Sequence, residues 1–123
     1  MSRASAAREP ARTDDVFAAL ASPVRRELLR LLRDEGHQPV QELASHFDMS
    51  RPSVSEHLKV LLDAGLVRER REGRNRYYRL RAQPLRLVEH WLAPYEEFWR
   101  ERITNLRELL DDEAARTSQE RHS

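Results

Sequence analysis

Apolar residues recur at intervals of three and four along most of the chain, a spacing that predicts a series of short amphipathic helices. The first helix is expected to begin with Thr13 or Asp14 as its N-cap. The second is expected to run from Ser22, an N-cap followed by a proline in the first turn, to Gly36. The third is expected to open at Pro39. The residues expected to face inward from these helices are Val16, Phe17, Leu20, Val24, Leu28, Leu29, Leu31, Leu32, Val40, Leu43, Ala44 and Phe47.

The fourth predicted helix has the most informative pattern. It is expected to begin with Ser50 as N-cap and Pro52 in the first turn, and to stop at Gly65. Its apolar face consists of Val54, Leu58, Leu61 and Leu62, and its polar face of Arg51, Ser53, Ser55, Glu56, His57 and Lys59. Short or forked polar side chains of this kind reach base edges and phosphates in a major groove, although an isolated helix presents a similar face to solvent alone. The preceding short helix and the tight turn at 48–49 complete a predicted helix-turn-helix.

Residues 66–81 predict a β-hairpin, because two extended runs flank a glycine-containing loop at 72–75. The segment contains seven arginines against two glutamates, a net charge of +5. Alone, such charge is typical of a solvated edge strand that resists aggregation. Directly after a helix with a polar outer face, it is typical of a wing, in which Arg74 and Arg76 are expected to contact the DNA backbone or the minor groove.

From Pro84 the pattern becomes helical again and continues to about Leu110, with Pro94 expected to kink the helix or split it in two. Four of the chain's eight aromatic residues lie here, which favours a subunit interface over a purely intrachain core. Together with the first helix, the residues expected in a dimer interface are Phe17, Leu85, Val88, Trp91, Leu92, Tyr95, Trp99, Ile103 and Leu106. The apolar stripe also includes Phe98, Leu109 and Leu110.

Composition limits the possibilities further. The 123 residues, 39% of them hydrophobic, fit one domain at 13–112 between a disordered arm at 1–12 and a disordered tail at 113–123. The net charge of +1 conceals segregation, since residues 89–120 carry nine acids against four arginines. Absence of cysteine excludes disulfides and thiolate metal sites, and the lack of a long apolar run or a signal segment predicts a soluble, cytoplasmic protein without membrane contact.

No catalytic residues are predicted. The sequence has no glycine-rich phosphate loop, no His-Glu-x-x-His motif and no nucleophile elbow, so we expect neither an enzyme nor a cofactor. The competing hypothesis is a winged-helix module that binds a protein through its acidic, aromatic C-terminal helix. The basic hairpin favours DNA, because several phosphate contacts require such charge. Arg25 and Arg26, near the start of the second helix, are expected either to meet phosphate or to pair with a nearby acid.

Several segments together resemble the ArsR family of winged-helix transcriptional repressors. They are residues 20–32 (LASPVRRELLRLL), 40–44 (VQELA), 50–61 (SRPSVSEHLKVL), 64–67 (AGLV) and 73–78 (GRNRYY), in the expected order and spacing within 13–110. The resemblance implies a mostly α fold with a small hairpin: a winged helix-turn-helix with helices 1–4, a two-stranded wing and a C-terminal dimerisation helix. It also implies a homodimer that represses transcription from a palindromic double-stranded DNA operator.

Several members of that family release DNA on binding a metal ion, but their ligands are not present in this sequence. One family site uses two cysteines spaced by one residue after Glu-Leu, where this chain has Ala44, Ser45 and His46. The other begins with Asp-x-His, where this chain has Val88 two residues before His90, and no second histidine follows in the predicted helix. We therefore expect no metal at either site and interpret His46 and His90 as packing or surface residues. The chain has thus either lost metal sensing or senses something else, and the sequence leaves open whether His46 or His90 belongs to a non-standard metal site.

Overall fold

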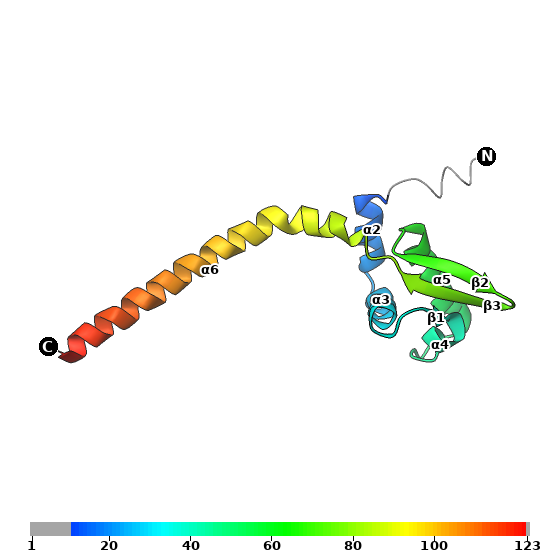
Figure 1. Cartoon of the computed structure of the whole chain (residues 1–123), viewed down its shortest axis with the longest axis horizontal. Helices are drawn as coiled ribbons and strands as arrows, with labels where there is room; N and C mark the ends of the chain where they lie inside the picture. The colour runs from blue at the N-terminus through cyan, green and yellow to red at the C-terminus, as the bar shows by residue number, and fades with distance from the viewer. Residues whose placement is uncertain (1–10, 123) are drawn as a thin grey trace. The chain divides into compact units, whose positions relative to one another are not determined.

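A computed structural model describes residues 11–122, and its contacts divide the chain into one compact unit that extends to Val88 and another from Glu89 onward (Figure 1). The elements follow the chain in this order: α2 (Thr13–Leu20), α3 (Pro23–Glu35), β1 (Gln38–Pro39), α4 (Val40–Ala44), α5 (Arg51–Asp63), β2 (Val67–Glu72), β3 (Asn75–Leu80) and α6 (Leu85–His122). This is a helix-rich winged helix-turn-helix, as the sequence predicted. The predicted arm at 1–12 lies outside the described residues except for its last two, and Ala11 packs against the core.

Serine caps determine where the two long helices of the first unit begin. The Ser22 side chain accepts a hydrogen bond from the Arg25 backbone N–H at 3.3 Å, and Ser50 accepts one from the Ser53 N–H, also at 3.3 Å. Both satisfy a donor that the first helical turn leaves without an intrahelical partner, so both predicted caps are confirmed. The capping expected at the first helix is wrong, because Thr13 is already helical and the N-cap is Arg12, which makes no side-chain cap.

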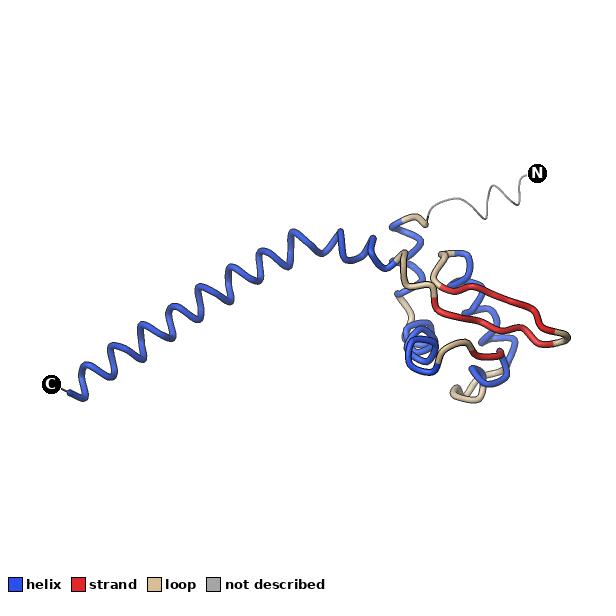
Figure 2. Tube along the Cα trace, viewed as in Figure 1, coloured by secondary structure: helices blue, strands red, loops and turns tan. Residues whose placement is uncertain are grey.

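The sheet has three antiparallel strands in the order β1-β3-β2 (Figure 2). Strands β2 and β3 pair from Val67 opposite Leu80 to Glu72 opposite Asn75, so the loop of the wing is shorter than the predicted 72–75. Gly73 supplies the left-handed backbone, with a φ of 61°, that a tight hairpin turn needs. The residue pattern predicted two strands but not β1, because two residues are too few to show alternation.

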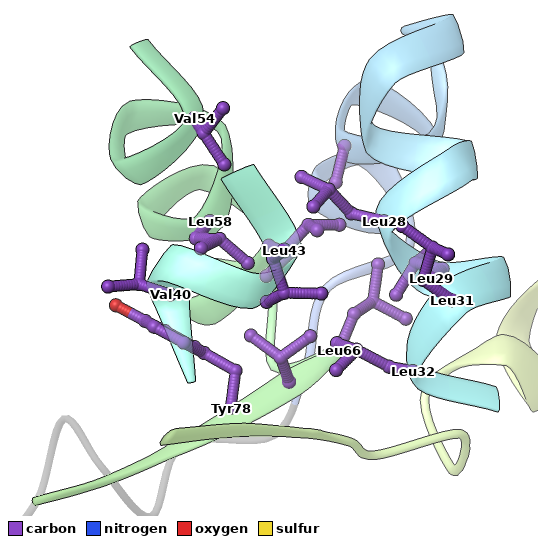
Figure 3. Close-up of a cluster of buried hydrophobic side chains, with 14 of the residues drawn as sticks. Leu28, Leu29, Leu31, Leu32, Val40, Leu43, Val54, Leu58, Leu66 and Tyr78 are labelled. Carbon is purple, nitrogen blue, oxygen red and sulfur yellow. The ribbon is translucent and has the colours of Figure 1, made fainter. Parts of the chain in front are cut away.

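The core of the first unit lies between α3, α4, α5 and the inner face of the sheet (Figure 3). Its buried members are Val16, Ala19, Leu28, Leu29, Leu31, Leu32, Val40, Leu43, Val54, Leu58, Leu61, Ala64, Leu66, Val67 and Tyr78. Full burial of each large aliphatic side chain contributes roughly 1.5–3 kcal/mol. The predicted apolar faces of α3 and α5 therefore hold both helices in fixed orientation.

Helix α6 is longer than the sequence predicted. It spans 38 residues as one helix with Pro94 inside it, so the proline does not split it. It also continues through 113–122, where we expected a disordered tail. The residues there include Ala114, Ala115 and Gln119, which have high helix propensity even though they form no apolar face. Among the described residues, no helix is long and apolar enough to cross a membrane.

Candidate nucleic-acid interface

The polar face of α5 points away from the core because the opposite face is anchored in it. Val54, Leu58 and Leu61 are completely buried. The predicted reading residues lie on the other side of the helix, where Arg51, Ser53, Glu56 and Lys59 are exposed and Ser55 and His57 are half-buried. The fold thus presents all of these side chains on the accessible side of one helix, as a helix that enters a major groove requires.

The first turn of α5 is fixed by its own hydroxyl groups. Ser50 Oγ and Ser53 Oγ lie 2.9 Å apart, in addition to the cap bond between Ser50 and the Ser53 N–H. Both side chains remain exposed. Ser50 therefore has a structural role that accounts for its presence without DNA, and any phosphate contact it makes comes on top of that role.

Gln41, whose role the sequence did not predict, connects α5 to the wing. Gln41, on α4, donates from Nε2 to Asn75 Oδ1 at 3.2 Å and accepts at Oε1 from Arg51 Nη2 at 3.5 Å. The Gln41 amide thereby joins Arg51, the first residue of α5, to Asn75, the first residue of β3. The amide carries one donor and one acceptor end, so it can serve both partners at once.

A shallow hollow of about 290 Å³ separates α5 from the wing. It is lined by Ser55, Glu56, Lys59, Leu62, Glu69, Arg76 and Tyr78. Within it, Arg76 Nη1 lies 3.5 Å from Glu69 Oε2, and the Tyr78 hydroxyl donates to the same oxygen at 2.8 Å. Burial, followed by the bond to Glu69, raises the pKa of Tyr78 to about 12, so the phenol remains a neutral donor.

The two arginines expected at the wing are therefore not equivalent. Arg76 is ion-paired with Glu69 and half-buried, whereas Arg74 is exposed at the tip and forms no ion pair with any residue that the structure describes. Arg74 is thus available for a phosphate. Arg76 can contact DNA only by sharing or leaving Glu69.

The outer face of the wing is also basic. Arg68 and Arg79 lie directly opposite each other on β2 and β3, and Arg70 pairs with Glu72. Like charges in directly opposed positions destabilise a sheet, so this pair adds positive potential without stabilising the strands. The positive charge that the sequence showed at 66–81 is therefore distributed over both faces of the hairpin.

Of the two alternatives expected for Arg25 and Arg26, contact with phosphate or pairing with a nearby acid, the structure contradicts the second. Neither forms a salt bridge with a described residue, and both donate to carbonyl groups at the C-terminal end of α2: Arg25 to Ala18 and Ala19, and Arg26 to Leu20 at 2.7 Å. Arg25 also contacts α5, because its Nη1 lies 3.2 Å from His57 Nδ1. Hydrogen bonds to backbone carbonyls leave no pattern in a sequence, which is why neither role was predicted.

The second unit presents an apolar stripe along α6. Its exposed members are Trp91, Leu92, Tyr95, Phe98, Trp99, Ile103, Leu106, Leu109 and Leu110. The most exposed aromatic ring, that of Trp99, has 62% of its surface accessible. Three residues expected in the interface are less exposed: Leu85 and Val88 pack partly against the core of the first unit, and Phe17 is half-buried. Large apolar side chains exposed along one helix are typical of an interaction site.

The metal sites of the ArsR family have no counterpart here in the part of the chain that is described. Residues 11–122 contain no group of three or more histidine, cysteine, aspartate or glutamate side chains placed to hold a metal ion. His46 lies 3.9 Å from Glu35, a pair rather than a ligand set. The available residues therefore do not fit the metal centres of that family.

Comparison with known proteins gives consistent matches. Residues 22–69 match the model of the bacterial regulatory protein, arsR family. The transcriptional repressor SdpR of Bacillus subtilis is 35% identical over 82 residues, which cover 67% of this chain and 90% of that protein. The crystal structure of an ArsR family transcriptional regulator, RHA00566, is 40% identical with a TM-score of 0.64, over 71% of this chain and 89% of that one.

A solution NMR structure adds information on assembly. It describes the homodimeric winged helix-turn-helix DNA-binding domain of Mb0332 from Mycobacterium bovis, a possible ArsR-family transcriptional regulator. That domain is 31% identical to this chain, with a TM-score of 0.54, over 72% of this chain and 82% of its own length.

Proposed function

Because the chain belongs to the ArsR family of bacterial regulatory proteins, we propose that it is a dimeric transcriptional repressor that binds a palindromic operator in double-stranded DNA. It acts in the cytoplasm and without catalysis. The observation that carries the proposal is the arrangement of α5. Three buried apolar residues fix the helix, and its entire polar face stays accessible beside a basic wing.

Recognition by α5 follows from the chemistry of its exposed face. Arg51 matches the two acceptors of guanine, and Ser55 and His57 form directional bonds to base edges, as does Glu56 with the amino group of cytosine. Ser53 is assigned to a base edge as well, and Ser50 and Lys59 are assigned to the flanking phosphates. The wing, through Arg74 and secondarily Arg76, follows the backbone or enters the adjacent minor groove.

Dimerisation makes this contact symmetric. The residues of the apolar stripe on α6 are exposed and are not covered by the rest of the described chain. A domain similar to this one is homodimeric. We propose that α6, with Phe17 of α2, forms the dimer interface. A two-fold dimer then places its two α5 helices in successive major grooves, about 34–36 Å apart, which accounts for a palindromic site.

The test is a selection of genomic DNA fragments with the purified protein, followed by footprinting of the enriched fragments. We expect a short inverted repeat whose half-sites are one helical turn apart. Enrichment without any shared sequence would argue against operator binding and would favour the alternative of a protein-interaction module. Arg33→Ala, which removes a positive charge from α3 where it pairs with Asp34, serves as a matched control for general electrostatic binding.

A further inference from the structure

The side chain of Arg25 forms hydrogen bonds to two other helices at once. Its Nε donates to the Ala19 carbonyl at 2.7 Å and its Nη2 to the Ala18 carbonyl at 3.1 Å, both in the last turn of α2. Its remaining terminal nitrogen, Nη1, lies 3.2 Å from Nδ1 of His57 on α5. One planar guanidinium thus joins the end of α2 to the polar face of α5.

The bond to Arg25 also determines where the proton of the His57 ring resides. A guanidinium can only donate, so Nδ1 is the acceptor, and the proton of the neutral imidazole is on Nε2. Among the described residues, no buried side-chain nitrogen or oxygen lacks a hydrogen-bond partner. Because no described protein group bonds to Nε2, this nitrogen is not fully buried and keeps access to solvent.

We infer that Arg25 is a positioning residue for DNA recognition, which holds His57 in the tautomer that presents Nε2–H outward from α5. This inference rests on the proposed function. It assigns His57 a donor role, so the base edge at this position is an acceptor: N7 or O6 of guanine, N7 of adenine or O4 of thymine. The amino group of cytosine, which only donates, is disfavoured. Without Arg25 the ring exchanges tautomers and rotates, and presents an acceptor as readily as a donor.

The chain supplies a matched control in the adjacent residue. Arg26 Nη1 donates to the Leu20 carbonyl at 2.7 Å, so Arg26 stabilises the same end of α2 that Arg25 does. It forms no hydrogen bond to α5 in the described structure. Arg26→Gln therefore removes a positive charge and a contact with the end of α2 but leaves His57 unchanged. Arg25→Gln removes the charge, the contact with the end of α2 and the hydrogen bond to His57.

The first experiment uses the full-length protein without DNA. Nitrogen-15 NMR of the imidazole ring distinguishes the two neutral tautomers directly. We expect a protonated Nε2 and an unprotonated Nδ1 for His57 in the wild type and in Arg26→Gln, and a mixture of tautomers in Arg25→Gln. A proton on Nδ1 in the wild type would overturn the inference, whatever the protein binds. Thermal unfolding of both variants shows whether their stabilities match.

The second experiment is a double-mutant cycle on the selected operator. Arg25→Gln and His57→Ala should each weaken operator binding about tenfold, the effect of removing one hydrogen bond to a base. The double variant should bind no more weakly than His57→Ala alone, within about twofold, because Arg25 acts through His57. Arg25→Lys keeps the charge but lacks the planar fork, so it should resemble Arg25→Gln. Wild-type binding by Arg25→Lys, or additive losses in the cycle, would show that Arg25 acts through its charge instead.

The two hypotheses fail in different ways. If no operator is selected, the proposed function fails and the role of Arg25 in recognition fails with it. If the operator is bound normally and only the cycle or the tautomer disagrees, the proposed function stands and the assignment of Arg25 is wrong.

Discussion

Glu69 on β2 lies directly opposite Tyr78 on β3, and its carboxylate accepts a 2.8 Å hydrogen bond from the buried phenol. The Tyr78 ring belongs to the hydrophobic core, while Glu69 borders the hollow between α5 and the wing. A single hydrogen bond therefore links the core of the first unit to the wall of the candidate DNA site.

This pair predicts a specific loss of stability at alkaline pH. The pKa of Tyr78 is raised from 10.0 to about 12 in the folded protein, chiefly by burial and then by Glu69. Its stabilising contribution is fully present below pH 10 and disappears as the pH rises through the folded value. At neutral pH, Tyr78→Phe should cost about 1 kcal/mol in the free energy of unfolding. Between pH 10 and pH 12 this difference should shrink and reverse. Denaturant unfolding across that range is the measurement, and a parallel decline of both proteins would contradict the assignment.

A second prediction concerns α5, the proposed recognition helix. Ser55→Ala combined with Glu56→Ala should weaken operator binding by roughly 1–3 kcal/mol for each hydrogen bond to a base that is removed, with nearly unchanged affinity for a scrambled duplex. Both side chains are accessible and neither has a side-chain bond to another described residue, so unfolding should be unaffected. Fluorescence titration on the two duplexes tests this. Equal losses on both would show that these residues contact only the backbone.

The wing should behave in the opposite manner. Arg74 is exposed at the tip and has no described carboxylate partner, so Arg74→Ala should weaken operator and scrambled duplexes alike. The slope of log affinity against log salt should become shallower by about 0.9, the value expected when one phosphate is no longer neutralised. Titrations at several salt concentrations measure it. Arg33→Ala is the charge-matched control, and an unchanged slope in Arg74→Ala would place the tip away from DNA.

A fourth prediction concerns assembly. Trp99→Ala should weaken dimerisation by at least ~2 kcal/mol, or roughly 30-fold, because large aromatic residues at the centre of an apolar stripe dominate interface energies. Glu108→Ala, nine residues farther along and on the opposite side of α6, should change little. Sedimentation equilibrium distinguishes the two. A wild-type protein that is monomeric at micromolar concentration would exclude this interface.

The fifth prediction is independence from metals. Zinc, nickel or cobalt should leave operator affinity unchanged, because the described residues do not assemble a ligand set. Titration of each metal into the operator-binding assay is the measurement. A stoichiometric ion that changes the affinity tenfold, about 1.4 kcal/mol of coupling, would contradict the prediction. His90 and Glu101, spaced by close to three helical turns, would then be the first residues to replace.

Helix α5 and the β-hairpin could be predicted because the sequence features that specify them are local. Ser50, Pro52 and Gly65 mark the limits of α5 in the sequence, and its apolar spacing identifies the face that the core buries. The wing follows from alternating residues on either side of a glycine. Each of these features depends on neighbours within a few positions along the chain.

The features that were missed depend on contacts between distant segments. Strand β1 exists only because Gln38 and Pro39 pair with β3. The bridge formed by Gln41 and the contact of Arg25 with His57 join residues more than 30 positions apart. No periodicity records such bonds, so they become visible only once the helices and strands are packed together.

The side chains on the polar face of α5 differ in their bonds to the rest of the protein, and this difference determines which positions can be substituted during evolution. Three exposed or half-exposed residues form no side-chain hydrogen bond or ion pair within the described protein: Ser55, Glu56 and Lys59. Substitutions at these positions should therefore change the preferred operator sequence with little effect on folding. His57 is constrained differently, since its ring is bonded to Arg25. Across natural relatives, residues 25 and 57 should therefore be substituted together. Relatives without the arginine at position 25 should also have a different residue at position 57.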